Sequence, residues 1–213
     1  MQSYYAARAS EYDVVYEKPE RQADLRQIEQ WLPSILSGQR VLEVACGTGY
    51  WTQFLAPVAL SIVAVDSSAE TLRIAEQRVL HSTVRFEVGD AYALQHHGHS
   101  FSAGFAGFWF SHVPLDRQCE FLRGLNEALE PGAKVVLLDN RFVEGSSSAI
   151  SERDLAGNTY QSRKFCDGST HRVLKNFPTE VQLLALIKGG LGQSALFTEW
   201  PFFWALEYRV PEA

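Results

Sequence analysis

The sequence predicts an α/β fold, built on a doubly wound and mostly parallel sheet with helices on both faces. Two observations support this prediction. Short apolar runs alternate with longer amphipathic segments along most of the chain, an order typical of a parallel sheet covered by helices. Near the C-terminus, two closely spaced aromatic-rich runs follow at 195–200 and 202–209. That spacing predicts an antiparallel hairpin at one edge of the sheet.

The elements follow in a regular order. A tyrosine-rich lead, which we expect to fold over the sheet as a lid, precedes a helix at 20–36. Parallel strands are expected at 40–44, 61–65, 84–88, 102–108 and 134–139. Helices are expected at 52–59, 69–80 and 115–129. In the region 141–178, the runs 158–165 and 171–177 predict a hairpin around Asp167 and Gly168, and a helix at 179–188 follows.

Composition limits the classes of function. The chain has 213 residues, 46% of them hydrophobic, enough for one domain with a full core. Its 25 acidic residues outnumber its 19 basic ones, which argues against a nucleic-acid partner because Lys and Arg neutralise phosphates. We see neither a signal-peptide pattern nor an apolar run of the roughly 20 residues that span a bilayer. Three widely spaced cysteines indicate no disulfide framework. We expect a cytoplasmic protein.

The most informative stretch is 41–52, where a buried strand ends and a helix begins across the turn Ala45-Cys46-Gly47-Thr48-Gly49. Glycine there lets a ligand lie directly against the backbone. Thr52 occupies the position where a dinucleotide site would have its third glycine. Glu43, near the strand end, repels a pyrophosphate and attracts an ammonium group. The turn therefore predicts a site for a cationic ligand.

Two further acidic residues end the next two strands. Asp66 can accept hydrogen bonds from both hydroxyls of a ribose. Asp90 can accept one from an exocyclic amino group, and Ala91 can offer its backbone N–H to a ring nitrogen. Together with Glu43 these residues describe a ligand with an amino-acid end, a ribose and an adenine, which is S-adenosylmethionine.

These features resemble the class I S-adenosylmethionine-dependent methyltransferases, specifically the branch that acts on small molecules. The resemblance extends from about residue 4 to residue 140. It rests on the motifs at 43–49, Asp66, 89–91, 108–113 (Phe-Trp-Phe-Ser-His-Val) and 129–133 (Leu-Glu-Pro-Gly-Ala). The resemblance implies a Rossmann-like, seven-stranded sheet with its last strand antiparallel. It also implies S-adenosylmethionine as cofactor and S-adenosylhomocysteine as product.

In this family the residues after the fourth strand line the acceptor pocket, which makes His112 the candidate catalytic residue. An imidazole can take a proton from a hydroxyl or ring N–H, and the alternative, that His112 only orients the acceptor, stays open. We expect Tyr4, Tyr5, Tyr12 and Trp109 to complete the acceptor pocket. The expected cofactor-binding residues are Tyr16, Arg21, Glu43, Ala45, Gly47, Gly49, Trp51, Asp66, Ser67, Asp90, Ala91 and Phe108. Among these, Arg21 would pair with the cofactor carboxylate, and aromatic rings would face the sulfonium.

The sequence thus predicts an enzyme that moves a methyl group to an oxygen or nitrogen of a small aromatic or heterocyclic acceptor. Its single domain, 1–213, comprises a lid and helix (1–36), a cofactor-binding core (40–140), a cap that covers the acceptor or contacts another subunit (141–178), and a C-terminal helix and strands (179–213). The alternatives are a non-catalytic module that binds the cofactor as a sensor or partner, and a nicotinamide enzyme. We expect a monomer or homodimer, with no nucleic-acid or membrane partner. We expect no metal, because the loop histidines His96, His97 and His99 lack an accompanying acid.

Overall fold

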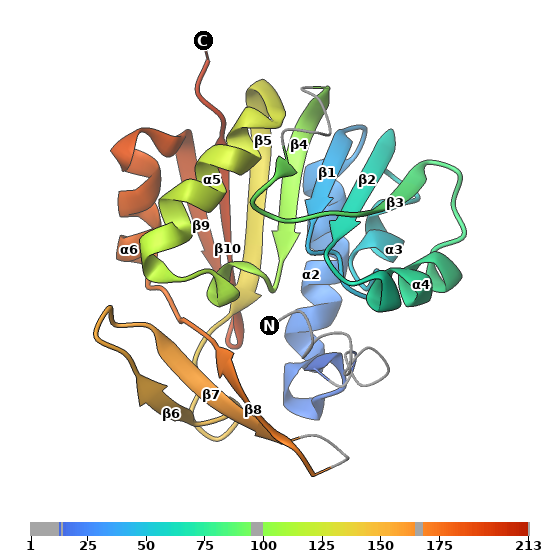
Figure 1. The fold of residues 1–213 in the computed structure, drawn as a ribbon. Helices are drawn as coiled ribbons and strands as arrows, with labels where there is room; N and C mark the ends of the chain where they lie inside the picture. The colour runs from blue at the N-terminus through green and yellow to red at the C-terminus, as the bar shows by residue number, and fades with distance from the viewer. Residues whose placement is uncertain (1–12, 14, 95–99, 165–167, 213) are drawn as a thin grey trace.

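A computed structural model of the chain, which describes residues 13, 15–94, 100–164 and 168–212, has a seven-stranded sheet at its centre (Figure 1). The strand order is β3-β2-β1-β4-β5-β10-β9. The first five strands are parallel. Strand β10 runs antiparallel to both β5 and β9. The predicted doubly wound sheet with an antiparallel edge hairpin is confirmed.

The bounds of most strands agree closely with the prediction, but β5 begins five residues before the predicted strand 134–139, and the helices agree less closely. The strands are β1 (Arg40–Val44), β2 (Ser61–Asp66), β3 (Val84–Val88), β4 (Phe101–Gly107), β5 (Leu129–Asn140), β9 (Gln193–Glu199) and β10 (Phe203–Arg209). The helices are α2 (Gln22–Leu36), α3 (Thr52–Leu55), α4 (Ala69–Arg78), α5 (Gln118–Glu127) and α6 (Glu180–Leu186). Short 3-10 turns are η2 (Pro19–Arg21), η4 (Phe110–His112) and η5 (Leu115–Arg117), and a π turn, η6 (Ile187–Leu191), extends α6.

The predicted helix at 115–129 differs most from the structure. It is divided into η5 and α5, and Leu129 belongs to β5, where it pairs with Phe101 of β4. Pro131 and Gly132 follow closely, and neither residue continues a helix readily. The apolar period continued through Leu129 because that side chain is buried in the same core as α5.

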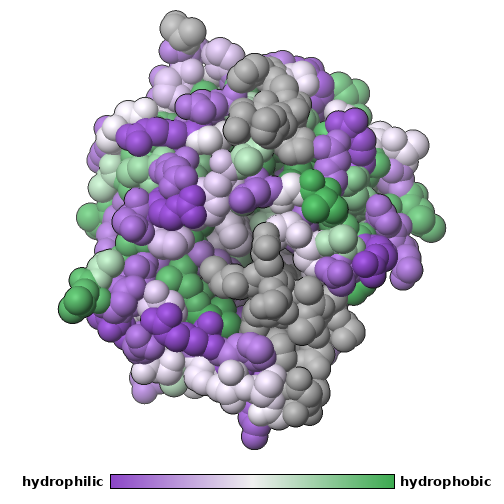
Figure 2. All heavy atoms as spheres, viewed as in Figure 1, coloured by the Kyte–Doolittle hydropathy of each residue, from purple (hydrophilic) through white to green (hydrophobic). Residues whose placement is uncertain are grey.

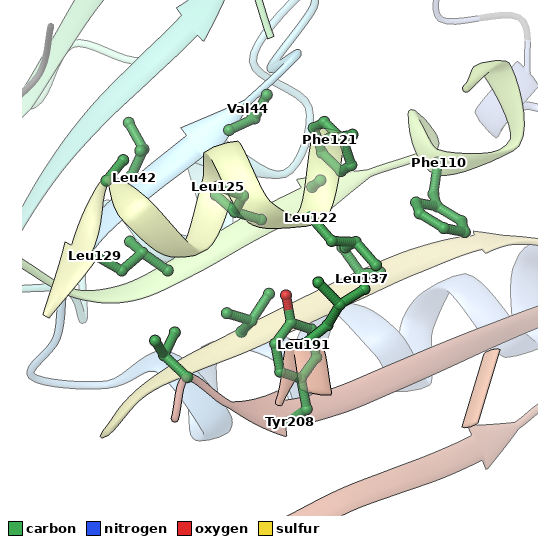
Figure 3. Close-up of a cluster of buried hydrophobic side chains, with 14 of the residues drawn as sticks. Leu42, Val44, Phe110, Phe121, Leu122, Leu125, Leu129, Leu137, Leu191 and Tyr208 are labelled. Carbon is green, nitrogen blue, oxygen red and sulfur yellow. The ribbon is translucent and has the colours of Figure 1, made fainter. Parts of the chain in front are cut away.

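Each face of the sheet has its own hydrophobic core. Helices α5 and α6 cover one face, where Phe121, Leu122 and Leu125 of α5 lie against Leu42 of β1 and Leu137 of β5 (Figure 3). Helices α2, α3 and α4 cover the other face and bury a second cluster. Two cores on opposite faces hold the parallel strands in register, so their carboxyl ends form one edge on which a site can be built. In the described part of the chain, no helix has both the length and the apolarity of a membrane span.

A second, three-stranded antiparallel sheet is formed by β6 (Ile150–Arg153), β7 (Thr159–Lys164) and β8 (Thr170–Leu174). It confirms the predicted hairpin, and β6 is an addition that the sequence did not indicate, because all four of its residues are exposed and show no alternation. This small sheet lies beyond the carboxyl ends of β4 and β5 (Figure 1). Hydrophilic side chains gather over it at the bottom of Figure 2.

Candidate functional site

The turn after β1 has a backbone that requires small residues. Ala45, Gly47 and Gly49 have φ angles of 55°, 57° and 75°, values in the left-handed region that favours glycine. A Cβ atom on Gly49 would lie 3.0 Å from the Cβ of Ala75 in α4. The N–H of Gly49 donates to the carbonyl of Cys46 at 3.0 Å. The predicted glycine turn is therefore tight, and it is packed directly against a helix.

Glu43, near the end of β1, carries a buried acid without a hydrogen-bond partner. Glu43 is only 1% exposed. Its Oε2 atom makes no hydrogen bond to any described residue. Burial raises the pKa of Glu43 to about 8. The nearby Thr52 hydroxyl, which lies outside hydrogen-bond geometry, opposes this rise in pKa, and the negative charge of Asp66 adds to it. An unpaired buried carboxylate is costly. An ammonium group of a bound ligand would pair with it, which is what the predicted cofactor offers.

Asp66, at the end of β2, is partly used by the protein itself. Its Oδ2 accepts from the Gly47 N–H at 2.9 Å, and its Oδ1 accepts from the Ser68 N–H at 2.9 Å and the Thr71 hydroxyl at 3.2 Å. A carboxylate has about four acceptor positions. The backbone N–H of Ser67 also acts on this carboxylate. At most one position therefore remains, whereas the sequence predicts two for a ribose. Burial raises the pKa of Asp66, against the effect of these hydrogen bonds.

The end of β3 lies beside Asp66, because the N–H of Gly89 donates to the Asp66 carbonyl at 3.0 Å. Asp90 follows and accepts from the N–H of Tyr92 at 2.9 Å. Ala91 is buried, whereas Ser67 is exposed. The predicted acids of β1, β2 and β3 thus follow three neighbouring strands of the same sheet.

Three aromatic residues predicted for the cofactor, Tyr16, Trp51 and Phe108, form one cluster. The rings of Tyr16 and Phe108 stack with their centroids 5.4 Å apart. The ring of Trp51 contacts Phe108 edge-on, with a centroid distance of 5.8 Å. Phe108 has a φ angle of 58°, an uncommon conformation for a bulky residue and one found at functional sites. Sequence reasoning missed Tyr50, which stacks on Tyr16 at 3.5 Å.

The residues predicted for the acceptor pocket have different locations. Trp109 faces α5, where its ring meets Phe121 edge-on at 6.4 Å. Tyr4, Tyr5 and Tyr12 lie outside the described residues, as do the loop histidines His96, His97 and His99.

His112 is buried in η4, beneath the small sheet. Its Nδ1 lies 2.6 Å from the carbonyl oxygen of Leu174, so Nδ1 carries the proton and donates. In the neutral ring, Nε2 is then the acceptor. Burial, with the positive charges of Lys175 and Arg163, lowers the pKa of His112 well below its usual value. The ring is neutral at physiological pH and has the tautomer that a base acting through Nε2 needs.

Arg21 lies at the end of β5. Its residue is 3% exposed, and it donates from Nη1 to Asn140 Oδ1 at 2.7 Å and from Nε to the Ser146 hydroxyl at 3.0 Å. Its described hydrogen bonds therefore connect the N-terminal lead to β5, and none of them reaches the glycine turn.

Sequence reasoning missed a buried ion pair beside His112. The Lys175 ammonium donates to Asp139 Oδ1 at 3.0 Å and to the Ser111 hydroxyl at 2.5 Å, and Ser111 N–H donates to Asp139 Oδ2 at 2.8 Å. Burial alone would raise the pKa of Asp139, but the charge of Lys175 holds it below its ordinary value. A signal was present, since Asp139 ends an apolar strand as Asp66 does, and Lys175 is the only charge in the run Val173-Leu174-Lys175-Asn176-Phe177.

Comparison with known proteins gives matches in sequence over part of the chain. A family model described as a methyltransferase domain matches residues 41–132. The demethylmenaquinone methyltransferase of Renibacterium salmoninarum is 36% identical over 104 residues, which cover 48% of this chain and 41% of that protein. The magnesium-protoporphyrin O-methyltransferase of Rhodobacter capsulatus is 44% identical over 62 residues, 28% of each chain. The chain thus spans less than half the length of these relatives.

Among solved structures, similarity extends over nearly the whole chain. The DhpI-SAH complex is 29% identical with a TM-score of 0.80, over 100% of this chain and 96% of that one. The DhpI-SAM-HEP complex is 30% identical with a TM-score of 0.79, over 97% of this chain and 94% of that one. The small sheet and the N-terminal helix therefore fall within the region of similarity.

Proposed function

The chain belongs to the class I S-adenosylmethionine-dependent methyltransferases, and from that premise we propose that it transfers a methyl group to an oxygen or nitrogen of a small aromatic or heterocyclic molecule. The observation that carries this proposal is the buried Glu43 beside the glycine turn, whose Oε2 has no hydrogen-bond partner among the described residues. Such a group suits the ammonium of the family's cofactor. S-adenosylmethionine, when bound, supplies a methyl group on a positively charged sulfur and leaves as S-adenosylhomocysteine.

The residues of β1 to β3 divide the work of holding the cofactor. Glu43 pairs with the amino group, the remaining acceptor position of Asp66 takes a ribose hydroxyl, and Asp90 with the Ala91 N–H contacts the adenine. The aromatic rings of Tyr16, Trp51 and Phe108 face the sulfonium in this proposal. The remaining cofactor residues are Ala45, Gly47, Gly49 and Ser67. Arg21 contacts the acceptor instead of the cofactor carboxylate, because its described partners lie at the end of β5.

His112 acts on the acceptor in this proposal. Its Nδ1–H is held by the Leu174 carbonyl, so Nε2 takes the proton that an O–H or N–H acceptor loses as its new bond to carbon forms. Orientation under the small sheet supplies most of the rate, and such positioning is worth about 7–11 kcal/mol. The base contributes about 10²- to 10⁴-fold more. The 141–178 cap excludes water from this reaction.

Release of S-adenosylhomocysteine in the presence of a library of phenols and azaheterocycles tests the reaction. The non-catalytic alternative, a sensor or partner module, predicts tight binding of S-adenosylhomocysteine and no release with any member. A nicotinamide enzyme predicts binding of NAD instead. Titration calorimetry with the two ligands distinguishes these classes.

A substitution at His112 tests its role. His112→Asn keeps a donor for Leu174 and removes the base. We expect kcat to fall about 10²- to 10⁴-fold while affinity for S-adenosylhomocysteine stays unchanged. A fall of less than about tenfold would assign His112 a positioning role only.

A further inference from the structure

The small sheet covers the main sheet with a polar face. Residues alternate along β7, so that Thr159 and Gln161 are buried and Arg163 is half-buried, while Ser162 and Lys164 between them are exposed. The covered face of an antiparallel sheet is usually apolar. On this face Val173 of β8 lies opposite Gln161, and Thr159 and Gln161 donate to the carbonyl oxygens of Lys175 and Ser148. Arg163 thus adds a positive charge to a face that is mostly polar.

Cationic side chains from two distant parts of the chain meet beneath this face. Lys175 follows β8 and reaches Asp139 and Ser111. Arg21 comes from the N-terminal lead and reaches Asn140, the neighbour of Asp139. These two side chains are 3% to 5% exposed, and both lie at the carboxyl end of β5, next to η4 and His112.

Two further cations lie close to this pair. The charge of Arg163 acts on Lys18, His112 and Lys175, and it lowers the pKa of each, in every case after the larger effect of burial. Lys18 itself donates to the carbonyl of Ser146. Arg163 is half-buried on β7, where its Nη2 donates to Gln161 Oε1 at 3.1 Å.

Among the described residues, three carboxylates act on these four cations. Asp139 is the fully buried carboxylate that faces Lys175, and Asp24, which accepts from the N–H of Phe202 at 2.8 Å, acts on Arg21. Glu20 is exposed, but it accepts from the Ser146 hydroxyl at 2.6 Å, and its charge acts on both Arg21 and Lys18. Holding like charges together at low exposure costs folding free energy unless an anion joins them.

Donor groups remain for such an anion. A guanidinium has five N–H donors, and Arg21 uses its Nε and Nη1 with partners among the described residues. An ammonium has three, and Lys175 uses two. Fork-shaped guanidinium donors beside an ammonium suit an oxyanion with two or three oxygens.

We propose that the methyl acceptor carries an oxyanion, of carboxylate or phosphate type, bound under the small sheet by Arg21, Arg163, Lys175 and Lys18. The inference rests on the proposed function, because it identifies the chemical class of acceptor for the same site. It places the acceptor's anionic group at the end of β5, and the atom that receives the methyl group near His112.

The test compares acids with neutral isosteres in the full-length chain. Benzoate, phenyl phosphate and inorganic phosphate are titrated by calorimetry into the protein saturated with S-adenosylhomocysteine, alongside benzamide. We expect the acids to bind and benzamide to bind about tenfold or more weakly. Comparing the affinity for benzoate with that for the two phosphates shows whether the site prefers a carboxylate or a phosphate. Equal affinity for benzoate and benzamide, with phenyl phosphate no better, would overturn the proposal.

Arg163→Gln supplies the matched variant, and Lys164→Gln is its control. Both remove one positive charge from β7, but Lys164 is on the exposed face. We expect acid affinity to fall about tenfold in Arg163→Gln and to stay unchanged in Lys164→Gln. Equal effects of the two variants would reduce the site to general surface charge and overturn the proposal.

Failure of this inference is distinguishable from failure of the proposed function. If S-adenosylhomocysteine binds and is released in turnover but the acids do not bind, the acceptor class is wrong and the methyltransferase remains. If the acids bind and S-adenosylhomocysteine does not, the anion site stands and the proposed reaction is wrong.

Discussion

The two halves of the strand-end edge have opposite charge. At the ends of β1, β2 and β3 the side chains that we propose to hold the cofactor are the acids Glu43, Asp66 and Asp90. At the ends of β4 and β5, beneath the small sheet, the buried cations Lys175 and Arg21 lie with the buried acids Asp139 and Asp24, and the half-buried Lys18 and Arg163 add positive charge. One continuous sheet edge therefore has an acidic half, at the ends of β1 to β3, and a basic half, at the ends of β4 and β5.

The difference in charge indicates that the fold separates recognition of the cofactor from recognition of the acceptor. The acidic half is built from turns within the parallel sheet, and Asp66 is held by the backbone of Gly47 and Ser68. The basic half needs segments outside that sheet, since Arg21 precedes it and Lys175 lies in the cap, directly after β8. We infer that the core recognises the cationic cofactor and that the added segments recognise the acceptor.

The largest expected effect comes from breaking the buried pair in the basic half. Lys175→Met leaves Asp139 buried without its counter-charge, so the free energy of unfolding should fall by about 3–5 kcal/mol. Lys164→Met, an exposed lysine on β7, should change it by less than about 0.5 kcal/mol. Urea unfolding measures both.

A second variant keeps this prediction testable if Lys175→Met does not fold. Adding Asp139→Asn removes the stranded charge, and we expect it to restore most of the lost stability. The double variant should then bind S-adenosylhomocysteine normally and bind benzoate poorly. A double variant as unstable as the single one would show that the charge of Asp139 is not the cause.

The next largest effect on the free energy of unfolding comes from the acidic half, and it is an increase in stability. Folding raises the pKa of Glu43 from 4.5 to about 8, so the folded state binds the proton more tightly, and stability falls as pH rises from about 4.5 to 8. Glu43→Gln does not titrate. We expect it to stabilise the cofactor-free protein by about 3–4 kcal/mol at pH 7.5, with the gain growing between pH 5 and 8.

The same substitution should weaken the cofactor site. Loss of a charged hydrogen bond predicts about 10- to 100-fold weaker binding of S-adenosylhomocysteine. Glu76→Gln, an exposed residue of α4, is the control for both measurements. A variant that is no more stable and binds normally would show that Glu43 has another partner.

The acidic half was predictable from sequence because each of its residues lies next to the strand that positions it. A buried parallel strand is a continuous apolar run, so the acids that end such runs stand out, and the predicted bounds 40–44 and 84–88 agree with β1 and β3. Asp139 ends such a run too and had the same signal. Its partner Lys175 lies 36 residues further along the chain.

The basic half could not be predicted in the same way, because its geometry is tertiary. Arg21 was expected beside the cofactor carboxylate, and its contact with Asn140 spans 119 residues. No local pattern encodes such a contact. Strand β6 was missed for a related reason, since a fully exposed strand has no buried face and therefore no alternation.

The pH dependence of cofactor binding tests the acidic half on its own. Below pH 8, Glu43 must lose its proton to pair with an ammonium group, so affinity for S-adenosylhomocysteine should rise about tenfold from pH 6 to 7. The rise should end near pH 8, where the ligand's own amino group begins to lose its proton. Calorimetry in two buffers should detect release of about one proton at pH 6.5. A flat profile in the unsubstituted protein would contradict the assignment of Glu43, and Glu43→Gln should abolish the rise.

The smallest effect comes from the helix cap that follows Asp66. The Ser68 hydroxyl accepts from the N–H of Thr71 at 3.2 Å and begins α4, so Ser68→Ala should lower the free energy of unfolding by about 1 kcal/mol. Ser67→Ala, at the exposed neighbouring residue, is the matched control and should change stability by less than about 0.5 kcal/mol.

The cap variant also measures how independent the two halves are. Because alanine keeps the backbone N–H that donates to Asp66, affinity for S-adenosylhomocysteine should change less than about threefold. In free energy this change is smaller than the expected loss of stability. Benzoate affinity should not change at all, since the cap and the basic half belong to different segments. An equal loss of both affinities would show that the halves are coupled through α4 and the glycine turn, and would replace the two-task division with a single cooperative site.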